Sequence, residues 1–324
     1  MRFLLRRLGF YLLAAWVSLT LNFLIPRLAP GDPASALQAR FQGRLEPSAL
    51  AAMKKVFGYT DAPLYVQYFD YVKSLLHGDF GISVAYFPAR VTEVIGSGLM
   101  WTLFLAGTSV VISFVLGSAL GLLAAWRRGG WLDSVAPPAF IFLGAFPYFW
   151  MAMLLLFSLG FVGGWFPVRH AYADQLTMGW NWPFVLSAIH HAVLPATSIV
   201  IASLGGWLLG MRNTMIGILA EDYITMAQAK GLSPSRVMLH YAARNALLPN
   251  ITGFGMALGF VLSGSLLTEI VFSYPGQGFL LFQAVKSQDF PLMQGLFLSI
   301  TVAVLAANWL VDVAYVFLDP RTRR

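Results

Sequence analysis

Long runs of apolar residues, almost free of charge, constrain this chain more than any other feature of its sequence. A helix needs about 20 consecutive apolar residues to cross the hydrocarbon core of a bilayer. Of the 324 residues, 58% are apolar and only 11% are charged, whereas soluble domains are about a quarter charged. A water-soluble globule could not bury so much apolar surface, so the sequence predicts an all-α integral membrane protein.

Six segments are long and apolar enough to be transmembrane helices. The first ends at Pro26 without a cleavage site, so we expect a retained span and not a signal peptide. The third contains Pro147, which should kink the helix and free a backbone carbonyl. The six predicted spans are Gly9–Ile25, Met100–Trp126, Val135–Val162, Val185–Leu209, Ile251–Phe272 and Leu292–Leu318.

The Lys and Arg residues set the expected orientation, because short cytoplasmic loops carry an excess of them. This rule puts the N-terminus in the cytoplasm, and an even number of spans then puts the C-terminus there too. The same excess accounts for the formal charge of +7 without nucleic acid as a partner.

The predicted parts are residues 1–28 with the first span, an external segment 29–98, and a five-helix core 99–324 that includes a cytoplasmic loop 211–250.

Two short amphipathic helices are expected in the external segment. Leu45–Phe57 and Leu64–Leu76 have apolar residues at helical spacing. Turn-forming residues separate them.

The inner loop has a helical pattern interrupted by one glycine. Tyr223–Lys230 predicts a helix, and Gly231 can end it because glycine adopts the left-handed conformation without steric penalty. Ser233 suits the N-cap of a second helix, and Pro234 suits its first position. We therefore expect a helix, a turn and a short helix on the inner membrane surface, with Pro249 preceding the next span.

Two strings of this loop resemble permease subunits of binding-protein-dependent ABC importers, in the branch that carries oligopeptides, dipeptides and nickel. They are Ala-Gln-Ala-Lys-Gly-Leu at 227–232 and Arg-Asn-Ala-Leu-Leu-Pro at 244–249. Thr225 and Met226 depart from the general family signature, which has Glu and Ala there. Further strings similar to that branch lie at 27–33, 78–83, 146–150, 269–278, 289–295 and 319–321.

The resemblance implies a type I ABC importer-like permease fold in a bacterial or archaeal inner membrane. It implies half of a pathway for di- or oligopeptides that works by alternating access. The expected partners are a second homologous permease, two ATP-binding subunits and an extracytoplasmic substrate-binding protein. The chain has no Gly-x-x-x-x-Gly-Lys phosphate loop, so ATP and Mg belong to the partners, and we expect no enzyme activity and no cofactor in this chain.

The resemblance also implies that residues 233–241 form a coupling helix that docks on an ATPase subunit. The alternative is an amphipathic helix lying in the lipid headgroups. The candidate coupling residues are Ala227, Gly231, Ser233, Pro234, Arg236, His240, Tyr241, Arg244 and Pro249.

A few single residues suggest other roles. Glu269 is a candidate for a gate or the pathway, since an ionisable residue in a span is usually functional. Pro147 is a second candidate, because its kink could line the pathway. His170, His190 and His191 could bind nickel, but without Cys or a carboxylate cluster we favour capping or packing and predict neither a metal nor a catalytic site. Import of nickel or another small solute, and an ion-coupled secondary transporter, remain alternatives.

Overall fold

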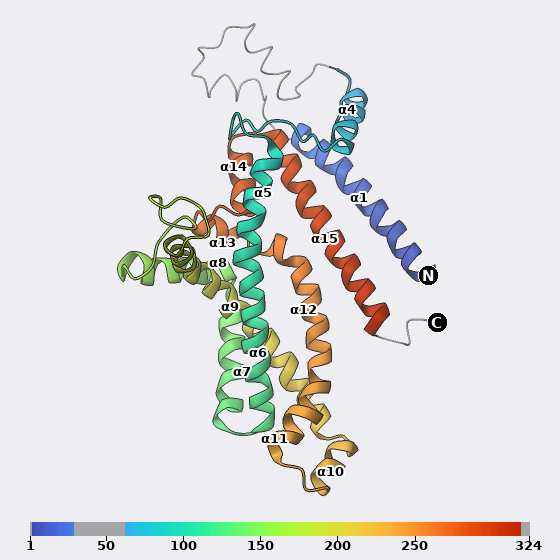
Figure 1. Ribbon diagram of the computed structural model, residues 1–324, viewed down its shortest axis with the longest axis vertical. Helices are drawn as coiled ribbons and strands as arrows, with labels where there is room; N and C mark the ends of the chain where they lie inside the picture. The colour runs from blue at the N-terminus through green and yellow to red at the C-terminus, as the bar shows by residue number, and fades with distance from the viewer. Residues whose placement is uncertain (1, 29–61, 319–324) are drawn as a thin grey trace. The chain divides into compact units, whose positions relative to one another are not determined.

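The computed structural model describes residues 2–28 and 62–318. In those ranges the regular elements are helices, together with one isolated bridge between Ile82 and Arg90 (Figure 1). The predicted all-α class is therefore confirmed. The predicted helix Leu45–Phe57 lies outside the described residues, and the division of the chain at residues 28 and 98 stays a prediction.

Four helices in the described ranges are long and apolar enough to cross a membrane. The second combines α5 (Val91–Thr102), the π-helix η1 (Leu103–Gly107) and α6 (Thr108–Trp126). The four candidate spans are Arg6–Ile25 within α1 (Arg2–Leu28), Val91–Trp126, α9 (Trp182–Leu219), and Phe290–Trp309 within α15 (Phe290–Leu318).

The predicted third span is a pair of helices bent by 95°. Helix α7 (Trp131–Gly144) ends before Pro147, and α8 (Tyr148–Leu155) begins after it and continues into the π-helix η2 (Leu156–Val162). Pro147 is extended, with φ −54° and ψ 135°, so the run of helical hydrogen bonds is interrupted there. The predicted kink is confirmed, and the pair counts as a fifth span if it crosses as one unit.

The predicted fifth span is divided at Ser265. Helix α12 (Arg244–Gly264) ends there, and a short helix, α13 (Leu266–Val271), follows. This pair is not among the candidate spans of the described residues. Six spans are therefore not confirmed, and the structure supports four or five.

The chain divides into two compact units, of which unit 2 is Leu103–Tyr274. Its centre is the packing of α6 on α9, where two glycines let the backbones touch. A Cβ atom on Gly121 would lie 2.3 Å from the carbonyl oxygen of Leu208, and one on Gly117 would lie 2.5 Å from Cβ of Trp207. Helix α9 has 38 residues, or about 57 Å at ~1.5 Å per residue, which exceeds the ~30 Å hydrocarbon core.

Unit 1 comprises Met1–Thr102 and Pro275–Arg324. Helix α4 has the predicted bounds, Leu64–Leu76, and packs on α1 through aromatic rings. The ring of Phe23 lies 5.3 Å from that of Tyr68 and 5.6 Å from that of Tyr71. Helices α14 (Gln277–Lys286), α5 and α15 pack together in the same unit.

A buried carboxylate fixes the start of α15. Asp289 is 0% exposed, and its Oδ2 accepts hydrogen bonds from Ser83 Oγ at 2.5 Å and from the Ala85 amide at 2.8 Å. Its Oδ1 accepts from the Leu292 amide at 3.0 Å. Burial raises the pKa of Asp289 above its ordinary value, although these hydrogen bonds oppose the rise. One side chain thus joins the loop before α5 to the first turn of α15.

We predict that Asp289→Asn lowers the free energy of unfolding by about 1–3 kcal/mol, because the new NH₂ group replaces one acceptor and faces buried donors. Thermal unfolding of the purified chain in detergent measures this loss. Asp174→Asn is the control, since the Asp174 side chain is 65% exposed. Equal unfolding temperatures for the two variants would contradict the assigned role of Asp289.

Candidate functional site

The segment 221–250 begins as predicted. Helix α10 (Asp222–Ala229) ends before Gly231, whose φ of +75° is left-handed. Helix α11 (Pro234–Arg236) then starts with Ser233 in an extended N-cap conformation, although the Ser233 side chain makes no capping hydrogen bond. The predicted helix, glycine turn and second helix start are confirmed.

The second helix is not short, which corrects the sequence-based expectation. Helix α11 continues through the π-helix η3 (Val237–Ala243) directly into α12, and the residues at both junctions have helical dihedral angles. Pro249 therefore lies inside α12 and not before it. The helix tolerates Pro249 because the carbonyl that loses its donor belongs to Asn245, and both residues are exposed.

The buried side of this segment packs on the ends of α6 and α9. Small side chains dominate it, so the helices approach closely. We call these residues the seat cluster: Ile224 and Ala227 of α10, Val237, Ala242 and Ala243 of η3, Ala246 of α12, Ala125 of α6, and Met211 and Met215 of α9. Ala227 is therefore part of the packing and does not contribute to the exposed surface.

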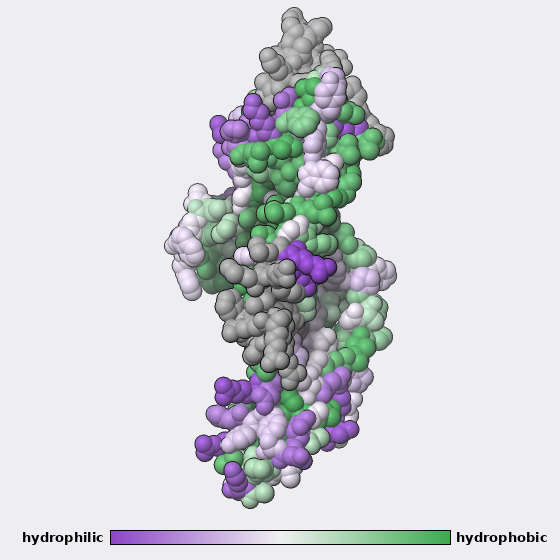
Figure 2. Space-filling model, turned by 90° about the vertical axis from the view of Figure 1, so that its right-hand side faces the viewer, coloured by the Kyte–Doolittle hydropathy of each residue, from purple (hydrophilic) through white to green (hydrophobic). Residues whose placement is uncertain are grey.

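The opposite side is exposed and carries cations and aromatic groups. Arg236, His240, Tyr241 and Arg244 are all exposed, and hydrophilic side chains gather over this end of unit 2 (Figure 2). Asn245 Nδ2 donates to Tyr223 Oη at 2.9 Å, an exposed hydrogen bond that ties α10 to α12. We call Arg236, His240, Tyr241 and Arg244 the docking face. A guanidinium and tyrosine surface of this kind suits binding to acidic or phosphate groups.

The two candidate gate residues lie elsewhere in unit 2. Glu269 is fully buried in α13 and accepts a hydrogen bond from Ser265 Oγ at 2.7 Å. Helix α13 packs against α8, the helix that begins after Pro147. The structure therefore brings together the helices at which these two residues lie. Neither residue belongs to the docking face.

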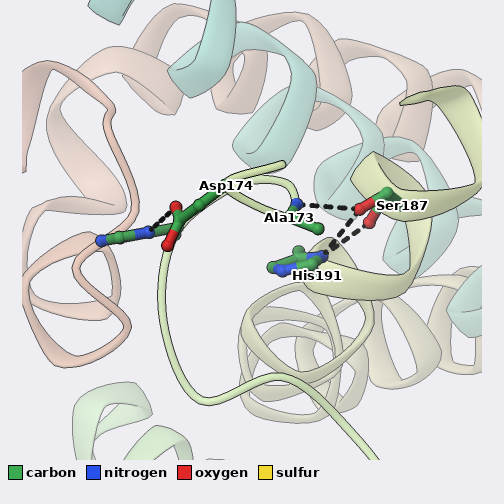
Figure 3. Close-up of polar contacts among 5 residues, drawn as sticks. Ala173, Asp174, Ser187 and His191 are labelled. Carbon is green, nitrogen blue, oxygen red and sulfur yellow. Dashed lines mark hydrogen bonds and ion pairs between the residues drawn. The ribbon is translucent and has the colours of Figure 1, made fainter. Parts of the chain in front are cut away.

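Each of the three histidines makes a polar contact in α9 or in the loop before it, and Figure 3 shows the contact of His191 with Ser187. His170 Nδ1 lies 2.8 Å from Asp174 Oδ1, and His191 Nδ1 lies 2.8 Å from the carbonyl oxygen of Ser187. His190 Nε2 lies 3.1 Å from the carbonyl oxygen of Trp165. Within residues 2–28 and 62–318, no three His, Cys, Asp or Glu side chains are grouped to hold a metal ion.

Sequence reasoning missed one ion pair. Arg212 Nε donates to Asp133 Oδ1 at 2.5 Å, from α9 to α7. Asp133 is the single acidic residue between Glu93 and Asp174. This isolation was the sequence feature that could have pointed to an ion pair. Its partner, 79 positions away, could not be identified from the sequence.

The comparison with protein families decides the identity. Residues 117–324 match the model for the inner membrane component of binding-protein-dependent transport systems. The chain belongs to this family. The predicted family is thus confirmed, and the chain is a multi-pass permease of the inner membrane.

Curated relatives match the permease along nearly its full length. The probable D,D-dipeptide transport system permease protein DdpB of Escherichia coli K12 is 34% identical, over 98% of this chain and 95% of the relative. The oligopeptide transport system permease protein AppB of Bacillus subtilis 168 is 32% identical, over 93% and 92%. The di/tripeptide transport system permease protein DppB of Pseudomonas aeruginosa UCBPP-PA14 is 32% identical, over 99% and 98%.

The turn at Gly231 can be tested with a matched pair of glycines. A Cβ atom would meet nothing within 4 Å at Gly231 or at Gly206, but only Gly231 has a positive φ. We predict that Gly231→Ala costs about 1–2 kcal/mol of stability, whereas Gly206→Ala, inside α9, gains about 0.5–1 kcal/mol. Thermal unfolding and the rate of tryptic cleavage at Lys230 measure the difference. Equal behaviour of the two variants would show that the turn is not left-handed.

Proposed function

We propose that this permease forms half of the translocation pathway of a peptide importer. All three relatives described above are named as permeases of dipeptide, oligopeptide or di/tripeptide transport systems. Identities near 32% support the class of peptides and not one particular peptide. Nickel or another small solute is the alternative substrate on the same scaffold.

The docking face supports the proposal that this segment couples ATP hydrolysis in a partner subunit to transport. A helix that lies in lipid headgroups turns its apolar side towards the acyl chains. Here much of the apolar side of the segment is already buried in the seat cluster, although Met226, Leu239 and Leu248 remain exposed. The side that remains exposes Arg236, His240, Tyr241 and Arg244, and Arg and Tyr are enriched in protein interfaces. These contacts favour an ATPase subunit over the membrane surface as the partner.

The complete assembly follows from this role. We propose six spans, with α12 as the fifth, and both termini in the cytoplasm. A second, related permease supplies the other half of the pathway, and two ATPase subunits supply ATP and Mg. A binding protein delivers peptide to the external side, and Pro147 and Glu269 belong to elements that gate the pathway.

The test of docking is a charge reversal on the exposed face. We predict that Arg236→Glu combined with His240→Glu abolishes co-purification of the ATPase subunits and uptake of trialanine into proteoliposomes. The level of the permease in the membrane should stay normal, because both side chains are exposed and outside the seat cluster.

Arg169→Glu is the matched control, since Arg169 is also exposed but lies in the loop before α9, which the proposed six-span topology puts outside the cell. Wild-type co-purification and uptake in the double variant would refute docking at this face. Uptake of radioactive nickel in place of trialanine by the unaltered complex would favour the alternative substrate.

The orientation can be tested with single cysteines, because the chain has none. Ser74 of α4 and Ser235 of α11 are both exposed. We predict that cysteine at position 74 reacts with a membrane-impermeant maleimide from outside and that cysteine at position 235 reacts only after the membrane is opened. Reaction of both from the same side would exclude the proposed topology.

A further inference from the structure

The ion pair between Asp133 and Arg212 joins three elements of unit 2. Asp133 lies in the first turn of α7, and its side chain is 7% exposed; the Arg212 side chain, on α9, is 23% exposed. Asp133 Oδ2 also accepts the amide of Gly129 at 2.9 Å, in the turn between α6 and α7. One carboxylate therefore holds α7, α9 and the α6–α7 turn together.

This ion pair lies directly beside the seat cluster. Arg212 follows Met211, which is 0% exposed and belongs to that cluster. A Cβ atom on Gly121 would lie 3.0 Å from the amide nitrogen of Arg212, so α6 and α9 are in backbone contact at this level. Close packing therefore connects the segment 221–250 to Arg212.

Helix α7 leads away from this point towards the sharp bend. It ends at Gly144, and the 95° break at Pro147 separates it from α8. Near the same end of α7, a Cβ atom on Gly144 would lie 3.1 Å from the carbonyl oxygen of Ala202 in α9. Movement of α7 would therefore change the position of the bend.

We propose that Asp133 and Arg212 are positioning residues that make α7 follow α9 when the segment 221–250 moves. The ion pair thereby transmits the displacement of the docking face to the bent pair α7–α8. This inference rests on the proposed function, because it assigns a route for the coupling that the docking face begins.

A purely structural ion pair would act differently. It would hold the fold together, so that its loss would lower the amount of assembled permease in the membrane. A transmitting ion pair should leave assembly intact and change the number of peptides moved for each ATP hydrolysed. Energetic coupling between two sites typically changes the affinity of one site by about 5–150-fold.

The experiment uses a neutral pair, Asp133→Asn with Arg212→Gln. Replacing Arg212 alone would leave the Asp133 carboxylate, which is 7% exposed, without its partner, and this is destabilising, whereas the neutral pair keeps similar volumes. The assembled importer is reconstituted in proteoliposomes with its binding protein, and trialanine uptake and ATP hydrolysis are measured together. We expect normal co-purification of the ATPase subunits and a fall of about tenfold in trialanine moved per ATP.

Arg212→Lys is the conservative variant. The observed bond uses Nε of Arg212, and a lysine ammonium, one atom further along the side chain, can reach the same carboxylate. This variant should retain most of the coupling. Asp174→Asn removes an exposed acid from the loop before α9 and should leave the ratio unchanged.

Three results would overturn the inference. The first is a normal ratio in the neutral pair, and the second is an equal loss in Arg212→Lys, because the charge would then not matter. The third is absence of the neutral pair from the membrane, which would make the ion pair a structural staple. Failure of the ATPase subunits to co-purify with the unaltered permease is a different outcome, since it refutes the proposed function itself.

Discussion

Backbone contact between α6 and α9 is the interaction on which the rest of unit 2 depends. It needs glycine at positions 117 and 121, where any side chain would meet the neighbouring helix. The two helices then form one rigid support, and the seat cluster is completed at its end by Ala125, Met211 and Met215. The same contact places Arg212 within reach of Asp133. Packing of small residues is the expected source of association between helices in a membrane, where the hydrophobic effect does not drive it.

Buried polar groups then fix how the remaining helices meet. An unpaired polar group in an apolar environment costs several kcal/mol by the usual estimates, about 2–7, so each pair specifies one arrangement. Asn250 of α12 donates to Ser118 Oγ of α6 at 3.2 Å and to the carbonyl oxygen of Trp207 in α9 at 3.3 Å. Asp289 does the same for unit 1 by joining Ser83 to the start of α15. These few contacts set the register of helices whose apolar surfaces could slide.

Local features of the fold could be predicted from the sequence, and long-range ones could not. The bounds of α4, the turn at Gly231 and the break at Pro147 depend on residues within a few positions of each other. The continuation of α11 into α12 was missed because Pro249 normally ends a helix, and its tolerance depends on exposure of Asn245. The bond between Asp133 and Arg212 was missed because the partners are 79 positions apart. The helix and the turn of the segment 221–250 were therefore predictable, whereas the division of its candidate residues into a buried and an exposed side required the structure.

The unbroken helix from α11 to α12 has a mechanical consequence in the function that we propose. A short coupling helix on a flexible linker would transmit force poorly, since the linker would absorb the displacement. Here Arg236 and His240 lie at the start of a helical rod that continues through η3 to Gly264. A push on the docking face therefore acts on α12 directly, as a lever, and on α9 through the seat cluster. The ion pair at Arg212 adds α7 to the same movement, so that one surface displaces three helices of unit 2 together.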